Sequence, residues 1–337
     1  MTVEEIVFKI KSLEWDIQNL SLDNSRVQKI TMALSSLNNL VQNKVSEADT
    51  DSGDLEKDDR QRSSTFNGMS AKEWVLNSRN VWSDVFQPPR TKEEAEHGAT
   101  YPKSLTDRLI SMYSKEGDLV FDPFLGTGTS LMSAIFKNRD AVGIELNPEF
   151  FEFAQKRVNS EYSMFSTCDV KLYNDNCMNL DNYLKDESVQ LTVTSPPYAD
   201  FIQKSLEDRA KVHKDSIIKN KNNSSVRQYS TSKEDFGNLP YDEFLKEAQG
   251  LLSLILKKTK SGGYGAWVVK DYRDTKNGIP YVDFHSDLAK VGEAAGFKYH
   301  DLIVWDQSNQ RSLFLQGYPS KFYTNQNSSF IVVFRKD

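Results

Sequence analysis

The sequence contains few residues of the kinds that bind metals or form disulfides. Among 337 residues there are two cysteines, Cys168 and Cys177, and four histidines scattered along the chain. Two cysteines cannot form a disulfide framework, and the histidines do not fall at the spacing of a zinc site. We therefore expect neither stabilising disulfides nor a bound metal.

Long apolar runs are also missing. No run approaches the roughly 18 residues that cross a bilayer, and the first residues lack a basic stretch followed by an apolar core. These absences predict a cytoplasmic protein that is neither secreted nor held in a membrane.

The chain lacks an overall excess of basic residues, since its formal net charge is −6. That charge is confined to residues 46–59, where seven acids and Lys57 sum to −6 and leave the remainder neutral. The seven acids are Glu47, Asp49, Asp51, Asp54, Glu56, Asp58 and Asp59. Residues 46–72 show no hydrophobic periodicity, so we interpret them as a flexible acidic and polar linker, with a DNA-mimicking acidic segment as the alternative.

Residues 1–45 have apolar side chains at steps of three and four. The pattern predicts two amphipathic helices that break near Ser21 to Ser25. A helical hairpin of this size cannot bury a core by itself. We expect it to pack on the rest of the chain or to mediate contact with a second copy or a partner subunit.

The segment Asp118–Glu145 reads as a strand, a glycine turn, a helix and a second strand that ends in an acid. In a doubly wound sheet, glycines in such a turn allow close approach of a ligand, and an acid at the next strand tip can accept both hydroxyls of a ribose. Leu131 stands where the dinucleotide fingerprint needs its third glycine, and the lysine of a Walker loop is also missing. The turn therefore favours a nucleoside ligand that carries no phosphates.

A second motif, Thr194-Ser-Pro-Pro-Tyr198, follows a run rich in β-branched residues. The two prolines fix the backbone and remove two N–H donors, so the neighbouring carbonyls and the Ser195 hydroxyl can face a planar base. Tyr198 offers a stacking surface. An ordinary turn is the alternative for this motif taken alone.

Together, Asp122-Pro-Phe-Leu-Gly-Thr-Gly-Thr129 and Thr194-Ser-Pro-Pro-Tyr198 resemble the two signature motifs of the S-adenosylmethionine-dependent amino-methylating DNA methyltransferases. The resemblance runs from about His97 to the C-terminus. It implies that Ser195, Pro196, Pro197 and Tyr198 hold the target base. It also implies a set of residues that bind S-adenosyl-L-methionine. These are Thr100, Tyr101, Pro102, Asp122, Pro123, Phe124, Gly126, Gly128, Thr129, Glu145 and Asn176. For the residue near the adenine, Asp175 is the alternative to Asn176.

The fold that this resemblance implies agrees with the pattern of strands and helices. We predict an α/β fold, a Rossmann-like doubly wound seven-stranded sheet of the class I methyltransferase type, over residues 73–337, with the N-terminal helices as an appendage. The predicted strands are Leu119–Asp122, Ala141–Glu145, Asp169–Tyr173, Val189–Thr194, Ala266–Lys270, Asp301–Trp305 and Phe330–Phe334. The last two are expected to form an antiparallel hairpin at the sheet edge. Helices are expected at Tyr241–Lys258 and Asp283–Ala295, with glycines ending them at Gly262-Gly263 and Gly296.

One polar connection, residues 199–239, is much longer than a crossover requires. From Phe201 to Lys233 it holds eight bases and three acids, a local charge of +5. We predict that it contacts DNA phosphates, with a solvated loop as the alternative. The residues assigned to this contact are Lys204, Arg209, Lys211, Lys214, Lys219, Lys221 and Arg227. Residues 307–327, rich in Asn, Gln and Arg, are a second candidate surface for reading bases.

These features predict a site-specific, double-stranded-DNA methyltransferase that acts on the N4 amino group of a flipped-out cytosine, in restriction–modification. Serine at the first position of Ser195-Pro-Pro-Tyr resembles the cytosine-N4 group. Adenine-N6 methylation is the first alternative, and an RNA methyltransferase or a catalytically silent cofactor-binding subunit is the second. Methylation at cytosine carbon 5 is rejected, because neither Cys168 nor Cys177 follows a proline as that family's nucleophile does.

Overall fold

The computed structural model describes residues 65–86, 101–162, 168–197 and 234–337, apart from 312, 314 and 316–319. The chain divides between Ser64 and Thr65, and every described residue belongs to the unit that begins at Thr65. The predicted hairpin 1–45, linker residues 46–64 and insertion residues 199–233 lie outside the described residues.

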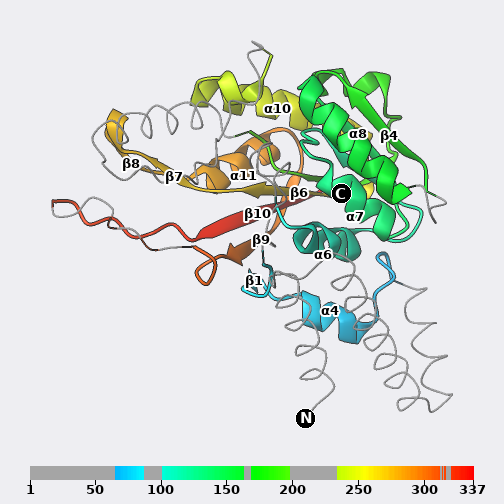
Figure 1. Cartoon of the computed structure of the whole chain (residues 1–337), viewed down its shortest axis with the longest axis horizontal. Coiled ribbons are helices and arrows are strands. Elements are labelled where there is room, and N and C mark those ends of the chain that lie inside the picture. The colour runs from blue at the N-terminus through cyan, green and yellow to red at the C-terminus, as the bar shows by residue number, and fades with distance from the viewer. Residues whose placement is uncertain are drawn as a thin grey trace, which may run out of the picture. The chain divides into compact units, whose positions relative to one another are not determined.

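An eight-stranded mixed sheet forms the centre of the described unit (Figure 1). Its order is β1-β9-β10-β6-β5-β2-β3-β4. The strands are β1 (Val81–Trp82), β2 (Leu119–Asp122), β3 (Asp140–Glu145), β4 (Val170–Asn174), β5 (Val189–Thr194), β6 (Thr259–Val269), β9 (Lys298–Asp306) and β10 (Ser328–Arg335). From β4 to β6 all neighbours run parallel, whereas β10 is antiparallel to both β6 and β9. The predicted doubly wound α/β fold is confirmed.

The hairpin at the end of the chain is antiparallel, as predicted, but it does not form the edge of the sheet. β10 lies between β6 and β9, and β1 pairs in parallel with β9 through Val81 and Trp82. A strand of two residues shows no alternation in the sequence, so β1 could not be predicted from periodicity. Trp82 is fully buried, which explains why this short strand is held in place.

Helices cover both faces of the sheet. On one face lie α6 (Lys103–Tyr113), α7 (Thr129–Phe136) and α8 (Pro148–Tyr162), which share a buried cluster with Val120 of β2. On the other lie α10 (Tyr241–Lys258), α11 (Phe284–Ala294) and the short helix η1 (Cys177–Asn182), which pack around Phe121. Adjacent strand residues point to opposite faces, so the continuous apolar run of β2 serves both layers. None of the described helices has the length and apolar content to cross a membrane.

The local sequence explains how the two C-terminal helices end. α11 stops before Gly296, whose φ of 106° a side chain would disfavour, as predicted. The prediction for Gly262-Gly263 is wrong, because α10 already ends at Lys258 and both glycines lie within β6. A Cβ on Gly263 would come within 2.7 Å of the Thr259 side chain, so close packing within the strand requires that glycine.

Smaller elements complete the unit. They are α4 (Ala71–Asn77), the ribbon of β7 (Tyr272–Asp274) and β8 (Ile279–Val282), and the turns η2 (Phe236–Asn238) and η3 (Thr275–Asn277). Residues 65–72, assigned by sequence to the linker, are folded here. The buried Asn67 amide donates to the Met112 carbonyl at 2.8 Å, and Ser70 caps α4 through Glu73.

Candidate active site

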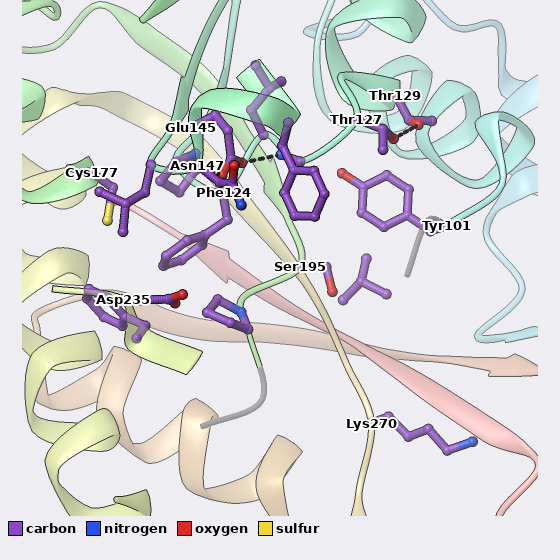
Figure 2. A pocket seen from close by; sticks show the side chains of 18 of the residues that line it. Tyr101, Phe124, Thr127, Thr129, Glu145, Asn147, Cys177, Ser195, Asp235 and Lys270 are labelled. Atoms are coloured by element: carbon purple, nitrogen blue, oxygen red, sulfur yellow. Dashed lines mark hydrogen bonds between the residues drawn. The ribbon is translucent and has the colours of Figure 1, made fainter. Parts of the chain in front are cut away.

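A cavity of about 490 Å³ opens at the carboxyl ends of β2, β3, β5 and β6 (Figure 2). This is the crevice where a doubly wound sheet binds its ligand. Its size suits a nucleoside-sized molecule, since small-molecule pockets span roughly 300 to 1,000 Å³. Both segments that carry the signature motifs contribute to its lining, through Phe124 and Gly126 on one side and Ser195 and Pro197 on the other.

Asp122, the last residue of β2, organises the floor of the site without lining it. Its side chain is fully buried and accepts four hydrogen bonds. The donors are the hydroxyls of Thr194 (2.6 Å), Ser130 (2.5 Å) and Tyr101 (3.2 Å), and the Phe124 amide (3.0 Å). Burial raises the pKa of the carboxyl, and these donors oppose that shift. Asp122 therefore fixes the positions of Tyr101, the glycine turn and the end of β5.

The glycine turn between β2 and α7 depends on backbone conformations that disfavour side chains. Gly126 has φ of 54° and Gly128 has φ of 83°. Gly128 begins α7 and packs on α8, where an added Cβ would lie 3.2 Å from the Ala154 Cβ. The Gly126 amide donates to Glu145 at 2.7 Å, so this donor is used by a carboxylate of the protein and not kept for a phosphate.

Glu145 stands at the tip of β3 with 9 % of its surface exposed, and it lines the cavity. One carboxylate oxygen accepts the Gly126 amide and the other accepts the Asn147 amide, at 2.7 and 2.8 Å. Each oxygen retains a second lone pair, which can accept a hydroxyl. Burial raises the pKa of Glu145 to about 7, against the lowering effect of the two amide bonds.

The far side of the cavity is suited to a purine ring. Phe124 and Phe236 meet edge to face with centroids 5.3 Å apart, and both line the cavity beside Asp235. Asp235 caps the turn η2 by accepting the Gly237 amide at 2.8 Å. Asn176 also lines this side. The alternative residue, Asp175, does not, because its carboxylate accepts the Tyr183 hydroxyl at 2.6 Å and the Asn179 amide at 2.9 Å.

The second motif follows β5 at the opposite wall. Ser195 is half-buried and lines the cavity with Pro197, while Pro196 is buried. β5 lies between β2 and β6, so its carboxyl end opens beside the glycine turn. In Figure 2, Ser195 faces the cavity between the Phe124 ring and Lys270. Tyr198 lies outside the described residues.

Most of the residues predicted to bind the cofactor line this one cavity. They are Tyr101, Pro123, Phe124, Gly126, Thr129, Glu145 and Asn176. Three others stand behind the surface: Asp122 is buried, Gly128 packs on α8, and Pro102 is buried at the start of α6. Thr100 lies outside the described residues, as do all seven basic residues predicted to contact DNA, from Lys204 to Arg227.

Several lining residues were not identified from the sequence. Asn147, Phe150, Asp235, Phe236 and Lys270 all contribute to the cavity. Lys270 directly follows β6, and ligands of such sheets bind at the carboxyl ends of the strands. This position in the sequence could have identified Lys270 as a lining residue. Asp235 and Phe236 sit at the end of the long insertion and had no such signal. Gln310 and Arg311, which also line the cavity, belong to the second surface that the sequence suggested for base contacts.

Outside the cavity, Asp271, Asp283 and His285 bring their ligand atoms within 4.8 Å of one another. His285 Nδ1 lies 2.9 Å from Asp271 and 3.0 Å from Asp283, and its ring stacks on Phe330. Asp271 also accepts the Tyr281 hydroxyl at 2.7 Å and the His285 amide at 3.1 Å. The group is thus held by its own hydrogen bonds, which join β8 and α11 to the end of β6.

Comparison with known proteins finds similarity to DNA methylases over part of the chain. A family profile described as DNA methylase matches residues 20–156. The chain is 35% identical over 96 residues to the type II methyltransferase M.HpaI of Haemophilus parainfluenzae, covering 28% of this chain and 31% of that one. It is 30% identical over 126 residues to the type II methyltransferase M.BglI of Bacillus subtilis, covering 37% and 35%. These matches span about a third of each relative. A solved structure of a putative rRNA-methylase from Clostridium thermocellum is similar at 16% identity and a TM-score of 0.41, covering 69% of this chain and 96% of that one.

S-adenosylmethionine is the cofactor of the methyltransferases that the two motifs resemble, and the lining of the cavity fits that molecule. Glu145 can accept ribose hydroxyls, and the rings of Phe124 and Phe236 can border an adenine. Acidic residues line the same side, which suits a ligand with a positively charged sulfur. The signature motifs, the family profile over residues 20–156 and the partial matches to type II methyltransferases together show similarity to the amino-methylating DNA methyltransferases.

Proposed function

We propose that this chain methylates the N4 amino group of a cytosine flipped out of double-stranded DNA, as the modification enzyme of a restriction–modification pair. The main observation in support of this proposal is that Ser195 and Pro197 line the same cavity as Glu145 and the glycine turn. A base held at the end of β5 would thus lie beside the cofactor site.

The role of the protein in such a reaction is mainly one of alignment. When bound, S-adenosylmethionine supplies a methyl group on a positively charged sulfur, so the protein needs no covalent intermediate. The Ser195 hydroxyl and the carbonyl beside Pro196 would accept the two hydrogens of the amino group. This draws the nitrogen lone pair out of conjugation and toward the methyl carbon. With S-adenosylmethionine bound, the N–C bond would form as the C–S bond breaks with its electron pair going to sulfur, and one proton would leave the nitrogen for solvent.

The residues on either side of Ser195 hold its backbone in place. Thr194, the residue before it, is anchored to the buried Asp122, and Pro196 is itself buried. A rigid backbone at this point keeps the acceptors in place without reorganisation during the reaction. Tyr198 is proposed to stack on the flipped base, and the basic residues from Lys204 to Arg227 to contact the DNA backbone.

Methyl transfer to nucleic acid tests this function. We would incubate the full chain with tritium-labelled S-adenosylmethionine and unmethylated plasmid DNA, and in parallel with RNA transcribed from that plasmid. We expect label in DNA alone. The Ser195→Ala variant should lower kcat by roughly 10 to 100-fold with unchanged cofactor affinity, because it removes an acceptor used in the transition state.

The matched control is Ser253→Ala, which removes an exposed hydroxyl on α10 that bonds only locally to the Gln249 carbonyl. It should behave as wild type. Label in RNA alone would replace DNA by RNA as substrate, and cofactor binding without any transfer would identify a silent subunit. Either result contradicts the proposal.

A further inference from the structure

The two sides of the cavity carry opposite charge. Toward β2 and β3 the lining contains the acids Glu145, Glu234 and Asp235. Toward β6, β9 and β10 the described lining contains two cations, Lys270 and Arg311, and no acid. Figure 2 shows Lys270 well apart from Glu145 and Asp235, with Ser195 between Lys270 and Glu145 in this view. The acidic side suits a cationic cofactor, whereas the basic side suits an anion.

Lys270 differs from other poorly exposed lysines in having no acidic partner among the residues that the structure describes. The Lys258 ammonium, with a side chain 4% exposed, lies 2.5 Å from Asp181 and 2.7 Å from Asp186, and Lys260 lies 3.1 Å from Asp118. Lys270 is half-buried, and its Nζ donates to the Gln326 carbonyl at 2.8 Å. Within the described part of the chain, no carboxylate pairs with it. A cation without a countercharge is costly to bury.

The charged groups around Lys270 increase that cost. The neighbouring acid, Asp271, is 2% exposed and is occupied by His285 and Tyr281. Burial, followed by repulsion from Arg311, lowers the pKa of Lys270 to about 8. Both cations line the same cavity. An anion between them would relieve both the desolvation and the repulsion.

We propose that Lys270 and Arg311 together bind the backbone phosphate of the nucleotide whose base enters the cavity beside Ser195. The inference rests on the proposed function. With the cofactor on the side of Glu145, a base held at Ser195 would have its own phosphate on the other side of the cavity, where the two cations lie. Arg311 supplies a planar fork of donors and Lys270 a point charge, a combination that matches phosphate oxygens. The subsite would favour entry of a flipped nucleotide over a free base.

The test separates binding of the target nucleotide from binding of the cofactor. We would measure kcat/KM for unmethylated plasmid DNA at saturating S-adenosylmethionine over a series of salt concentrations, using the full chain. Lys270→Gln should lower kcat/KM by about 10-fold or more. The same variant should also reduce the steepness of the slope of log kcat/KM against log salt concentration by about 0.7 to 0.9, which is the contribution of one phosphate contact. Arg311→Gln should do the same.

Two variants serve as controls. Lys270→Arg retains the charge and should restore both the rate and the salt dependence. Lys290→Gln removes a lysine on α11 with a side chain 71% exposed and should change neither. Calorimetric titration with S-adenosylmethionine should give the same affinity for all four variants, and thermal unfolding identifies any variant that fails to fold.

Each outcome decides the matter. If wild type methylates DNA and Lys270→Gln leaves the salt slope unchanged, the phosphate subsite is wrong while the proposed function stands. If Lys270→Gln instead weakens S-adenosylmethionine binding, the lysine holds the cofactor's carboxylate and the inference is also wrong. If Lys270→Gln fails to fold, an unchanged slope for Arg311→Gln overturns the proposal. If wild type methylates no DNA, both proposals fall together.

Discussion

The Thr194 hydroxyl donates a 2.6 Å hydrogen bond to the buried carboxylate of Asp122. The two residues are 72 positions apart in sequence and end the strands β5 and β2, which are neighbours in the sheet. This contact joins the segment that precedes Ser195 to the segment that precedes the glycine turn. The proposed base site and the proposed cofactor site would therefore share one rigid link, which a single substitution can remove.

We predict that Thr194→Val destabilises the protein by about 1 to 3 kcal/mol, because it deprives a buried carboxylate of one donor. The same strand offers a matched control in Thr192, which is also fully buried but whose hydroxyl has no hydrogen-bond partner among the described residues. Thr192→Val should be neutral or slightly stabilising. Chemical denaturation of both variants checks this, and equal losses of stability would show that the link to Asp122 has no special role.

The predicted strands β2 and β5 and the helix α10 match the structure at both ends, because their hydrophobic patterns and the turn residues around them determine these elements. The wall of the cavity was less predictable. It draws on segments that are distant in sequence, and residues such as Lys270 and Phe236 acquire their roles only when β6 and the turn η2 come together. Likewise, β7 and β8 are too short for a periodic pattern to indicate.

A pH dependence should follow from Glu145. Burial raises the pKa of its carboxyl to about 7, and the ionised form is the stronger acceptor for ribose hydroxyls. Cofactor affinity should therefore be greatest above pH 7 and fall as pH drops below it. Calorimetric titration with S-adenosylmethionine between pH 5.5 and 8.5 measures this effect.

Two variants sharpen the test of Glu145. Glu145→Ala should weaken binding at pH 8 by about 1.5 to 3 kcal/mol for each hydrogen bond lost and remove the pH dependence. Glu149→Ala, an exposed acid in the first turn of α8, should retain the wild-type behaviour. Wild-type affinity in Glu145→Ala would contradict the assignment to the ribose.

The glycine turn gives a prediction on stability. Gly128→Ala should cost about 1 to 3 kcal/mol, because φ is 83° and the new methyl would crowd Ala154 on α8. Gly250 lies within α10, where a Cβ would meet the Met178 side chain at an ordinary 3.6 Å. Gly250→Ala should therefore stabilise by about 0.5 to 1 kcal/mol. Thermal unfolding of the two variants should give shifts of opposite sign.

The His285 cluster should make stability depend on pH. Burial lowers the pKa of His285, but the hydrogen bond to and the charge of Asp271 outweigh it and raise the pKa overall. A raised folded-state pKa means that the imidazolium stabilises the fold below its unfolded pKa of about 6.5, and that this contribution is lost as pH rises through the folded value. The stability difference between wild type and His285→Asn should thus shrink from pH 6 to pH 9. A constant difference in urea denaturation would show that the ring acts by packing on Phe330 alone.

The identity of the methylated nucleoside tests most directly which atom of the DNA receives the methyl group. Plasmid DNA from a host without methyltransferases is methylated by the wild-type chain, digested to nucleosides and analysed by mass spectrometry against standards. N4-methylcytosine as the sole product is the result we predict from Ser195 and Pro196 at the end of β5. N6-methyladenine would contradict the choice of cytosine but would still agree with methylation of an amino group. 5-Methylcytosine would contradict the mechanism as a whole.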